Sequence, residues 1–394
     1  MMNSSIYFDT DVAEYELQQF LENGQIVVAY LSILLIVGIV GNIHVLTVYG
    51  PLKMKSNYQI FIVILAVNDL LACIFCLPFE VVYIRYKYTY ENAGACKLFR
   101  FFYYSFILSS GLLLTLTAVE RYRRVYTPFK EQLTKRTVLI ACGVVSGMSF
   151  LLSLPVLIFY DIVPKEIIEN HTVNGTKCGV WSDTFKSVHF SLLLLVSTVI
   201  LLIIIVAYSM IAKVICRQRR YVRRTSLSSR PSISERKTEV SMIQDNQVKG
   251  EIPSSDSVES STSKSNSLHL SARLSLSNVN GVKKKPASMR FKNNTVAIRN
   301  TITLMTVTIV SYLGILPIII LGIIKMSDGK SYDKIEEALG TAGSNILIRG
   351  YFINNIVNPF VYIFTDKQFR DGLRNIYRAI WASPYMQASW LVYI

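Results

Sequence analysis

Charged residues are scarce in this chain: they make up only 17% of its 394 residues, whereas hydrophobic residues make up 51%. Ordinary soluble domains carry about a quarter charged residues, so this composition argues against a soluble globular protein. A chain with this much apolar surface needs apolar surroundings. We therefore expect it to reside in a lipid bilayer.

Cysteine is also scarce, and its spacing does not suit a metal site. The six cysteines do not include two separate C-x-x-C units, the arrangement that would indicate a zinc site. Six scattered cysteines also argue against a disulfide-dense fold. The amino terminus lacks the basic segment and small-residue cleavage site of a secretory signal peptide. The first long apolar stretch is therefore expected to direct membrane insertion.

Positive charge is concentrated in one segment of the chain. A net charge of +15 would suggest a nucleic-acid partner in a soluble protein. However, residues 217–299 hold seventeen Lys/Arg against six Asp/Glu, so most of the excess lies in one hydrophilic insert. We therefore expect no nucleic-acid partner. The insert is rich in Ser and Thr and predicts a disordered third intracellular loop over 217–300.

Seven stretches are long and apolar enough to cross a bilayer. A helix needs about 20 residues to span a hydrocarbon layer about 30 Å thick, because each residue adds about 1.5 Å. The seven stretches are residues 26–49, 58–84, 96–122, 138–160, 188–214, 301–324 and 338–364. The sequence therefore predicts an all-α membrane protein: a seven-transmembrane helix bundle over 26–364, which the insert interrupts.

The distribution of basic residues predicts the orientation of the bundle. No Lys or Arg precedes Lys53, whereas five acidic residues precede the first span. Since basic residues favour the cytoplasmic side, residues 1–25 are expected to be the extracellular amino terminus of a multi-pass plasma-membrane protein. Residues 365–394 should then form an amphipathic helix 8 and a short cytoplasmic tail. Sequons that fall outside the cell predict glycosylation at Asn3, Asn170 and Asn174.

Two short motifs lie at the cytoplasmic ends of spans. The third span ends in Glu120-Arg121-Tyr122, which taken alone is equally well explained as an interfacial anchor. The seventh span carries Asn358-Pro359 near its end, where the proline frees a backbone carbonyl and kinks the helix. Each motif is short, but both stand at a meaningful depth in the membrane.

Polar residues also occur in the middle of the first two spans. Asp69 lies within the second span, where a carboxylate is costly unless a proton, a partner or an ion neutralises it. In the first span, Gly38 and Gly41 permit close approach of a neighbouring helix, and Asn42 supplies a hydrogen bond. A carboxylate at the depth of Asp69 indicates a function rather than inert packing.

Taken together, these motifs resemble those of the class A, rhodopsin-like G-protein-coupled receptors. The resemblance covers the seven spans but not the amino terminus or the insert. It implies a receptor, not an enzyme, that binds an extracellular ligand and activates heterotrimeric G proteins. The residues that it assigns to G-protein coupling and activation are Glu120, Arg121, Tyr122, Tyr208, Pro317, Asn358, Pro359 and Tyr362. The residues that it assigns to an allosteric sodium pocket, with Asp69 as the metal ligand for Na⁺, are Asp69, Ser110, Asn354, Asn355 and Asn358. It also implies a disulfide between Cys96 and Cys178.

The sixth span departs from the family pattern. Ile315 stands two residues before Pro317, where the family usually has a tryptophan, so the usual aromatic toggle is missing. The residue six positions before Thr303 is Ala297, and no acid stands near it to form an ionic latch with Arg121. We therefore expect appreciable basal activity.

Two positions narrow the ligand class. Tyr103 stands where amine receptors of this class place an aspartate, and Phe352 stands where opsins place the retinal lysine, so both subclasses are disfavoured. An aromatic run with a few fixed charges suits a peptide, and a neuropeptide or peptide hormone is expected. The candidate ligand-pocket residues are Glu80, Arg100, Tyr103, Tyr104 and Arg349.

Arg349 makes a specific demand on its surroundings. It stands ten residues before Pro359, which places it about 15 Å further toward the outside along a helix. An unpaired cation is expensive at that depth. It should therefore find an anion, either Glu80 or a ligand carboxylate such as the carboxy terminus of a peptide.

Other interpretations remain open from the sequence alone. A lipid or small-molecule ligand would use a similarly aromatic pocket, and a non-signalling scavenging receptor would account for the departures in span six. A transporter is disfavoured because seven spans do not divide into paired repeats. Arrestin and receptor kinases are expected to act on the Ser/Thr-rich insert, and segment 366–380, which alternates basic and apolar residues, is expected to bind membrane lipid.

Overall fold

The structure is a computed structural model, and it describes residues 12–50, 54–128, 130–169, 171–228, 287–327 and 329–382. The predicted glycosylation sites Asn3 and Asn170 lie outside these residues, as do much of the insert and the end of the tail. Asn174 lies in a strand. The chain divides into a bundle unit, Met1–Ala212 with Ala297–Ile394, and a second unit, Lys213–Val296.

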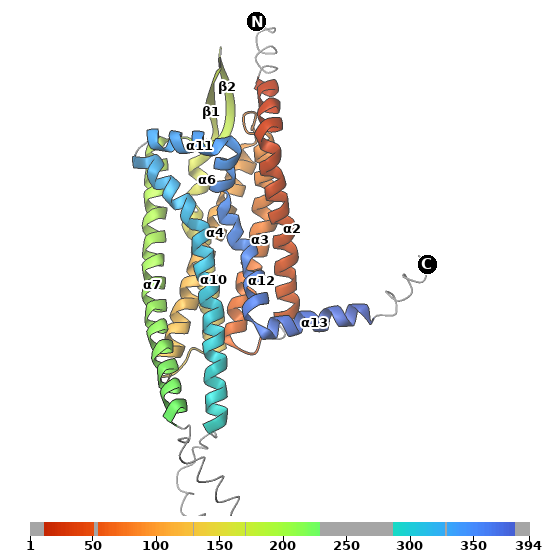
Figure 1. The fold of residues 1–394 in the computed structure, drawn as a ribbon. Helices are drawn as coiled ribbons and strands as arrows, with labels where there is room; N and C mark the ends of the chain where they lie inside the picture. Colours follow the sequence, from red (N-terminus) through yellow and green to blue (C-terminus); the bar gives the residue numbers. More distant parts are fainter. Residues whose placement is uncertain are drawn as a thin grey trace, which may run out of the picture. The chain divides into compact units, whose positions relative to one another are not determined.

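Long helices make up the bundle unit (Figure 1). In chain order the helices are η1 (Phe20–Gly24), α2 (Gln25–Tyr49), α3 (Asn57–Arg85), α4 (Ala93–Tyr126), α5 (Lys135–Ser153), α6 (Val156–Phe159), α7 (Asp183–Ser228), α10 (Ala287–Ser327), α11 (Gly329–Ile348), η3 (Gly350–Phe352), α12 (Ile353–Thr365) and α13 (Lys367–Trp381). Within the described residues, six helices are long and apolar enough to cross a membrane. The seventh predicted span corresponds to the stretch from α11 to α12.

Polar caps set where several helices begin. The Ser56 hydroxyl accepts a hydrogen bond from the backbone N–H of Gln59, whose side chain in turn accepts one from the backbone of Ser56. Asn92 caps α4, with its Oδ1 atom 2.9 Å from the backbone nitrogen of Ala95, and Thr134 caps α5 in the same way. These side chains satisfy N–H groups that the first turn of a helix leaves unpaired.

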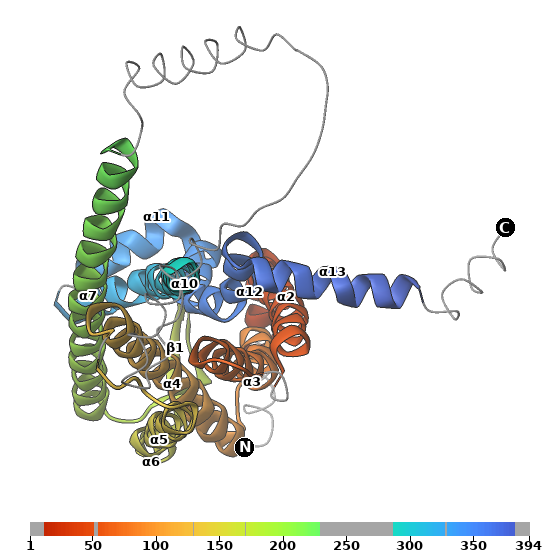
Figure 2. The same ribbon diagram turned by 90° about the horizontal axis from the view of Figure 1, so that it is seen from below.

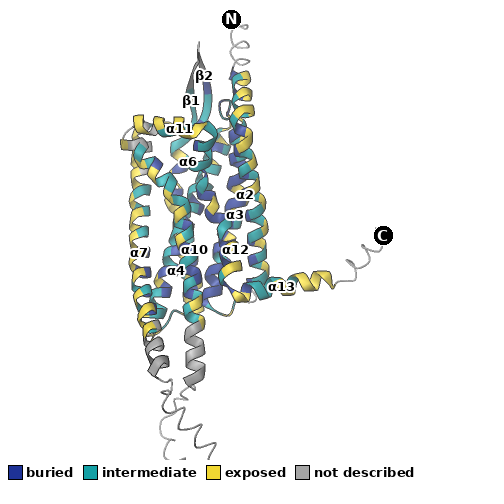
Figure 3. Cartoon of the chain, in the orientation of Figure 1, coloured by how far each residue is buried: buried dark blue, intermediate teal, exposed yellow. Residues whose placement is uncertain are grey.

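The surface of the bundle unit is apolar, as expected for contact with lipid. Large aliphatic side chains such as Leu151 are exposed, here by 66%, whereas many polar side chains lie inside. Figure 3 shows exposed residues along α7 and buried ones along α3 and α4. Helix α12 packs against both α2 and α3, and Figure 2 shows this arrangement along the bundle. Polar groups buried in such a bundle need partners, which the clusters described below provide.

A β-hairpin lies at one end of the bundle, which is called here the hairpin end (Figure 1). Strand β1 (Tyr160–Glu169) pairs antiparallel with strand β2 (His171–Val180). Cys178 of β2 forms a disulfide with Cys96 at the start of α4, and their Cα atoms lie 5.6 Å apart. The predicted disulfide is therefore confirmed, and it attaches the hairpin to α4.

The amino-terminal segment predicted over 1–25 is helical where the structure describes it. The helix starts at Val12 and continues through the π-helical turn η1 into α2. The Glu16 carboxylate is almost fully buried and accepts three hydrogen bonds from the loop between α3 and α4. Its oxygens lie 2.7 Å from the backbone nitrogen of Tyr88, and 3.1 and 2.7 Å from the backbone nitrogen and hydroxyl of Thr89.

The same loop also pairs with the hairpin. The backbone nitrogen of Thr176 donates to the carbonyl of Tyr88 at 2.7 Å, and the backbone nitrogen of Tyr90 donates to Thr176 at 3.3 Å. On the opposite side, the Tyr15 ring packs edge-on against Tyr88 with centroids 5.2 Å apart. The loop therefore contacts both the amino-terminal helical segment and β2, and it links them at the hairpin end.

Replacing Glu16 with glutamine is expected to loosen this joint. A hydrogen bond to a charged group contributes about 1.5 to 3 kcal/mol, and the substitution weakens three of them. The melting temperature of the purified protein should therefore fall by several degrees. Glu14→Gln removes the same charge from an exposed position on the same segment and should leave the melting temperature unchanged. Equal melting temperatures for Glu16→Gln and the wild type would contradict this expectation.

Two predicted spans are interrupted in the structure. The span predicted over 138–160 corresponds to the membrane-length segment Lys135–Phe159, in which Pro155, which has no N–H to donate, separates α5 from the short helix α6. The span predicted over 338–364 contains Gly340, whose φ of 69° lies in the left-handed region that favours glycine, and the 3-10 turn η3. Each of these breaks lies inside a predicted span.

The segment 217–300, which was predicted to be a disordered third intracellular loop, is helical at both of its ends. Helix α7 continues to Ser228 and helix α10 begins at Ala287, so both ends of the segment 217–300 are helical. Residues 229–286 lie outside the described part of the chain. Arg, Lys and Gln favour helices, and a helix that has crossed a bilayer can continue into water when its next residues are of this kind.

The segment predicted as an eighth helix forms α13, which marks the opposite end of the bundle, called here the α13 end (Figure 1). Asp366 caps this helix, with its Oδ1 atom 2.8 Å from the backbone nitrogen of Gln368. Its other carboxylate oxygen accepts hydrogen bonds from the hydroxyl groups of Tyr49 and Tyr58. One carboxylate therefore ties α13 to α2 and α3.

Candidate functional site

Three groups of buried and partly buried polar side chains lie at different depths in the bundle unit, and each joins residues from at least two separate parts of the sequence. Burying a charged group is costly unless it is paired and hydrogen-bonded, so the partners of each group matter for stability. The groups are the hairpin-end cluster (Glu80, Arg100 and Arg349), the middle cluster (Asp69, Ser110, Asn354 and Asn358) and the α13-end cluster (Asn57, Glu120, Arg121 and Arg124).

In the hairpin-end cluster, one carboxylate serves two arginines. The Glu80 Oε1 atom lies 2.7 Å from Nη1 of Arg100, and its Oε2 atom lies 2.8 Å from Nε of Arg349. The Glu80 side chain is only 3% exposed, and those of Arg349 and Arg100 are 8% and 14% exposed. The anion that Arg349 was expected to find is therefore Glu80. The cluster carries one negative and two positive charges.

The break before α12 positions Arg349. This residue is the N-cap of η3, where the chain changes from α-helical to 3-10 geometry. Its Nη1 atom donates to the side-chain oxygen of Asn345 at 2.9 Å and to the backbone carbonyl of the same residue at 3.3 Å. Asn345 was not expected from the sequence. It holds the guanidinium group in the orientation that reaches Glu80.

Aromatic rings surround the hairpin-end cluster. The guanidinium carbon of Arg100 lies 5.1 Å from the ring centroid of Tyr83 and 5.7 Å from that of Tyr103. These are cation–π distances. The Tyr104 hydroxyl lies 2.8 Å from that of Tyr160 on the hairpin, and the ring of His189 stacks edge-on against Tyr104 at 4.9 Å. Of the predicted residues, Tyr103 therefore lies beside Arg100, and the ring of Tyr104 packs edge-on against Tyr103 with centroids 5.0 Å apart.

The middle cluster consists of two hydrogen-bonded pairs, Asp69 with Asn358 and Ser110 with Asn354. Nδ2 of Asn358 donates to Asp69 Oδ2 at 2.7 Å, and Nδ2 of Asn354 donates to the Ser110 hydroxyl at 3.1 Å. Asn355 contributes differently, because its backbone carbonyl accepts a hydrogen bond from Asn42 at 2.8 Å.

Unpaired oxygens in the middle cluster fit a hard cation. In the described part of the chain, Oδ1 of Asp69, Oδ1 of Asn354 and Oδ1 of Asn358 are buried without a hydrogen-bond partner. Hard cations such as Na⁺ prefer carboxylate and amide oxygens. The residues present therefore fit the sodium pocket that the resemblance implies. Of the five predicted residues, Asn355 differs in that its backbone carbonyl is engaged by Asn42.

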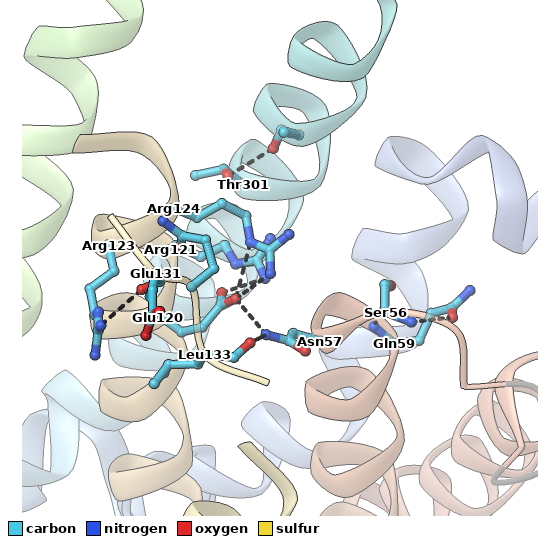
Figure 4. A network of polar contacts seen from close by, with 12 residues as sticks. Ser56, Asn57, Gln59, Glu120, Arg121, Arg123, Arg124, Glu131, Leu133 and Thr301 are labelled. Atoms are coloured by element: carbon cyan, nitrogen blue, oxygen red, sulfur yellow. Dashed lines mark hydrogen bonds and ion pairs between the residues drawn. The ribbon is translucent and has the colours of Figure 1, made fainter. Parts of the chain in front are cut away.

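The α13-end cluster centres on Glu120, as Figure 4 shows. Its Oε1 atom accepts hydrogen bonds from Nη2 of Arg124 at 2.8 Å and from Nδ2 of Asn57 at 3.0 Å. Its Oε2 atom forms an ion pair with Arg121, whose side chain is 1% exposed. Asn57 also donates to the carbonyl of Leu133 at 2.9 Å. Three helix-borne donors therefore share one carboxylate.

Other predicted activation residues have contacts of their own. The Tyr208 hydroxyl lies 2.9 Å from that of Thr308, which links α7 to α10. Tyr122 instead stacks on Tyr126 with ring centroids 5.0 Å apart. Tyr362 is buried. The two predicted prolines lie inside helices, Pro317 in α10 and Pro359 in α12.

A family model described as "7 transmembrane receptor (rhodopsin family)" matches residues 41–362 of the chain. This range includes all three clusters and both motifs. The chain belongs to this family. It is a multi-pass membrane receptor of the G-protein-coupled class, and the broken stretch from α11 to α12 is its seventh helix.

Curated relatives of the receptor include several with peptide names. The chain is 25% identical to the human cholecystokinin receptor type A and 26% identical to that of Cavia porcellus. Each alignment covers 86% of this chain and 78% of the relative. It is also 30% identical to the mouse neuropeptide Y receptor type 2 over 47% of this chain and 49% of that protein. These relatives and the family are signalling receptors rather than enzymes.

Some residues of the receptor's clusters could not be found by motif. Arg124 stands four residues after Glu120 on the same helix, a spacing that favours an ion pair and could have indicated it. Asn57 reaches Glu120 from another helix, 63 residues away in the chain. His189 lies on α7, and nothing in the local sequence distinguishes it from ordinary packing.

Proposed function

We propose that this receptor lies in the plasma membrane with its hairpin end outside the cell, where a peptide binds, and that it activates heterotrimeric G proteins at the α13 end. The basic residues of the short loops and of α13 support this orientation. The disulfide at the hairpin end also fits an oxidising exterior. Asn174 of β2 would then be available to glycosylating enzymes.

The hairpin-end cluster is the observation that carries the proposal of a peptide ligand. Fixed charges that are set among aromatic rings offer anchors both for apolar side chains and for a charged group. Relatives named for peptides, cholecystokinin and neuropeptide Y, favour the same class. A lipid or small molecule remains the second candidate, since the same rings would accept one.

The α13-end cluster is the part of the receptor proposed to meet the G protein. Activation would require Arg121 to leave Glu120, and Tyr208 and Tyr362 would then support the open state at this end. Within the described residues, the ion pair of Arg121 is with Glu120. No latch from α10 needs to be broken, so appreciable basal activity is expected.

Sodium is proposed to bind at the middle cluster and to stabilise the inactive arrangement. Replacing sodium chloride with choline chloride should then raise basal G-protein activation several-fold in membranes that contain the receptor. Asp69→Asn removes the charge that attracts the cation and should remove this difference. A sodium effect that persisted in Asp69→Asn would contradict the assignment.

Regulation is proposed at the insert and at helix α13. Receptor kinases and arrestin would act on the Ser/Thr-rich insert, where each phosphate adds about −1.5 to −2 charge. Helix α13 carries Lys367, Arg370, Arg374 and Arg378, and it would bind anionic lipid on the cytoplasmic leaflet.

The proposed function is tested in cells that express the receptor. These cells would be treated with an extract of tissue from the organism in which the receptor occurs. G-protein dissociation sensors would be recorded before and after protease digestion of the extract, with Arg121→Ala as the control. We expect a response that digestion abolishes and that Arg121→Ala lacks. A response that survives digestion would replace the peptide with a lipid or small molecule. Specific binding of extract components without a response from any G protein would support a scavenging receptor instead.

A further inference from the structure

The hairpin-end cluster has a net charge of +1, because one carboxylate faces two guanidinium groups. Both oxygens of Glu80 are already used, one by each arginine. Among the described residues, no second carboxylate pairs with Arg100 or Arg349. A buried cation without its own counter-charge is costly, because the apolar surroundings cannot replace its water shell. The cluster is therefore electrostatically incomplete.

Hydrogen-bonding capacity is unused in the same place. The Nε atom of Arg100 is buried and has no hydrogen-bond partner within the described residues. Arg349 has one nitrogen on Glu80 and one on Asn345, so its guanidinium group is fixed in direction. A guanidinium group presents a planar set of donors that matches the two oxygens of a carboxylate. The missing partner thus has the chemistry of a planar anion.

The surroundings also restrict what can carry that anion. The guanidinium group of Arg100 lies among the rings of Phe79, Tyr83 and Tyr103, at 5.1 to 5.7 Å from their centroids. A strongly hydrated, compact ion would lose its water among these rings without replacement. A carboxylate on an organic ligand brings its own apolar neighbours, which pack against rings of this kind.

We infer that the ligand delivers a carboxylate to Arg100 and Arg349, and that Glu80, which binds both guanidinium groups, holds them in place to receive it. This inference rests on the proposed peptide function and specifies its ligand. The carboxylate is either the free carboxy terminus of the peptide or an Asp or Glu side chain. A basic ligand group is disfavoured, because it would have to displace two arginines from Glu80.

Removal of one arginine separates this role from a structural one. In Arg100→Gln or Arg349→Gln, the remaining arginine and Glu80 form a neutral pair. The ligand-free receptor should therefore melt at or above the wild-type temperature. If the arginines served only to hold the helices together, either variant would melt several degrees lower.

The test uses synthetic tetrapeptide pools and purified receptor in lipid nanodiscs. The four matched pools differ in two respects. The carboxy terminus is either free or amidated, and the randomised residues either include or exclude Asp and Glu. The readout is the shift in melting temperature. We expect the amidated pool without acids to give the smallest shift in the wild type. Two pools are then compared: the pool with a free carboxy terminus and no acidic side chains, and the amidated pool with Asp and Glu. The pool that gives the larger shift in melting temperature identifies the source of the carboxylate.

Variants assign the effect to the cluster. Arg100→Gln and Arg349→Gln should lose the difference between acidic and neutral pools, and Arg349→Lys, which keeps the charge, should retain part of it. Arg85→Gln removes a cation that pairs with Glu16 rather than Glu80, and it should keep the full difference. Equal shifts from all four pools, zero included, would overturn the inference. A protease-sensitive response to tissue extract would leave the peptide function standing even then.

Discussion

Replacing Glu80 with glutamine is expected to abolish most cell-surface expression of the receptor. The substitution leaves Arg100 and Arg349 as two buried cations with no carboxylate between them. Removing one partner of a buried ion pair costs about 3 to 5 kcal/mol. That cost is a large part of the stability of a typical protein, about 5 to 15 kcal/mol. Surface expression would be measured by flow cytometry of an epitope-tagged receptor.

Two further variants show whether the charge imbalance is the cause. Glu91→Gln removes a carboxylate from an exposed position in the loop before α4, and it should be expressed like the wild type. The triple variant Glu80→Gln/Arg100→Gln/Arg349→Gln removes every charge of the cluster and should recover much of the expression. Wild-type expression of Glu80→Gln alone would show that the arginines do not depend on Glu80.

Replacing Glu120 with glutamine is expected to raise ligand-independent G-protein activation several-fold. The buried carboxylate is the ionic partner of Arg121 within the described residues, so its loss frees the arginine to leave the bundle. Glutamine has no charge to attract the guanidinium group, and the attraction that is lost is stronger in a buried site than in water. Basal activity would be recorded with G-protein dissociation sensors at matched surface expression.

Arg124→Ala should have the opposite effect. Arg124 competes with Arg121 for Glu120, from which it lies 2.8 Å, so its removal leaves the carboxylate to Arg121 and lowers basal activity. The matched control is Arg123→Ala, since Arg123 donates to the Glu131 carbonyl and not to Glu120. Equal basal activities of Arg124→Ala and Arg123→Ala would show that the competition does not matter.

Burial costs made part of the candidate site predictable from the sequence. A cation at the depth of Arg349 needs an anion, and Glu80 was one of two partners expected for it. The spans were predictable because a membrane requires long apolar helices. The disulfide between Cys96 and Cys178 followed from the family pattern, and the structure contains it.

The remaining features depend on contacts between distant parts of the chain. The second arginine on Glu80, and Asn57 on Glu120, come from other helices, so no local pattern reveals them. The acidic amino-terminal helical segment is held in place by Glu16, which accepts hydrogen bonds from backbone N–H groups in the loop after α3. Pro155 could have predicted the break between α5 and α6 inside the fourth span, because its effect on a helix is local.

Nucleotide exchange by purified G proteins in the presence of the purified receptor tests the central claim most directly. The receptor in nanodiscs would be assayed without extract and with the tissue-extract fraction whose activity is lost on protease digestion. We predict that the fraction stimulates exchange by the wild type, that Arg349→Gln keeps basal exchange but loses the stimulation, and that Arg121→Ala loses both. Stimulation of both variants at the wild-type level would contradict the account, because neither the proposed ligand site nor the proposed G-protein site would then be required.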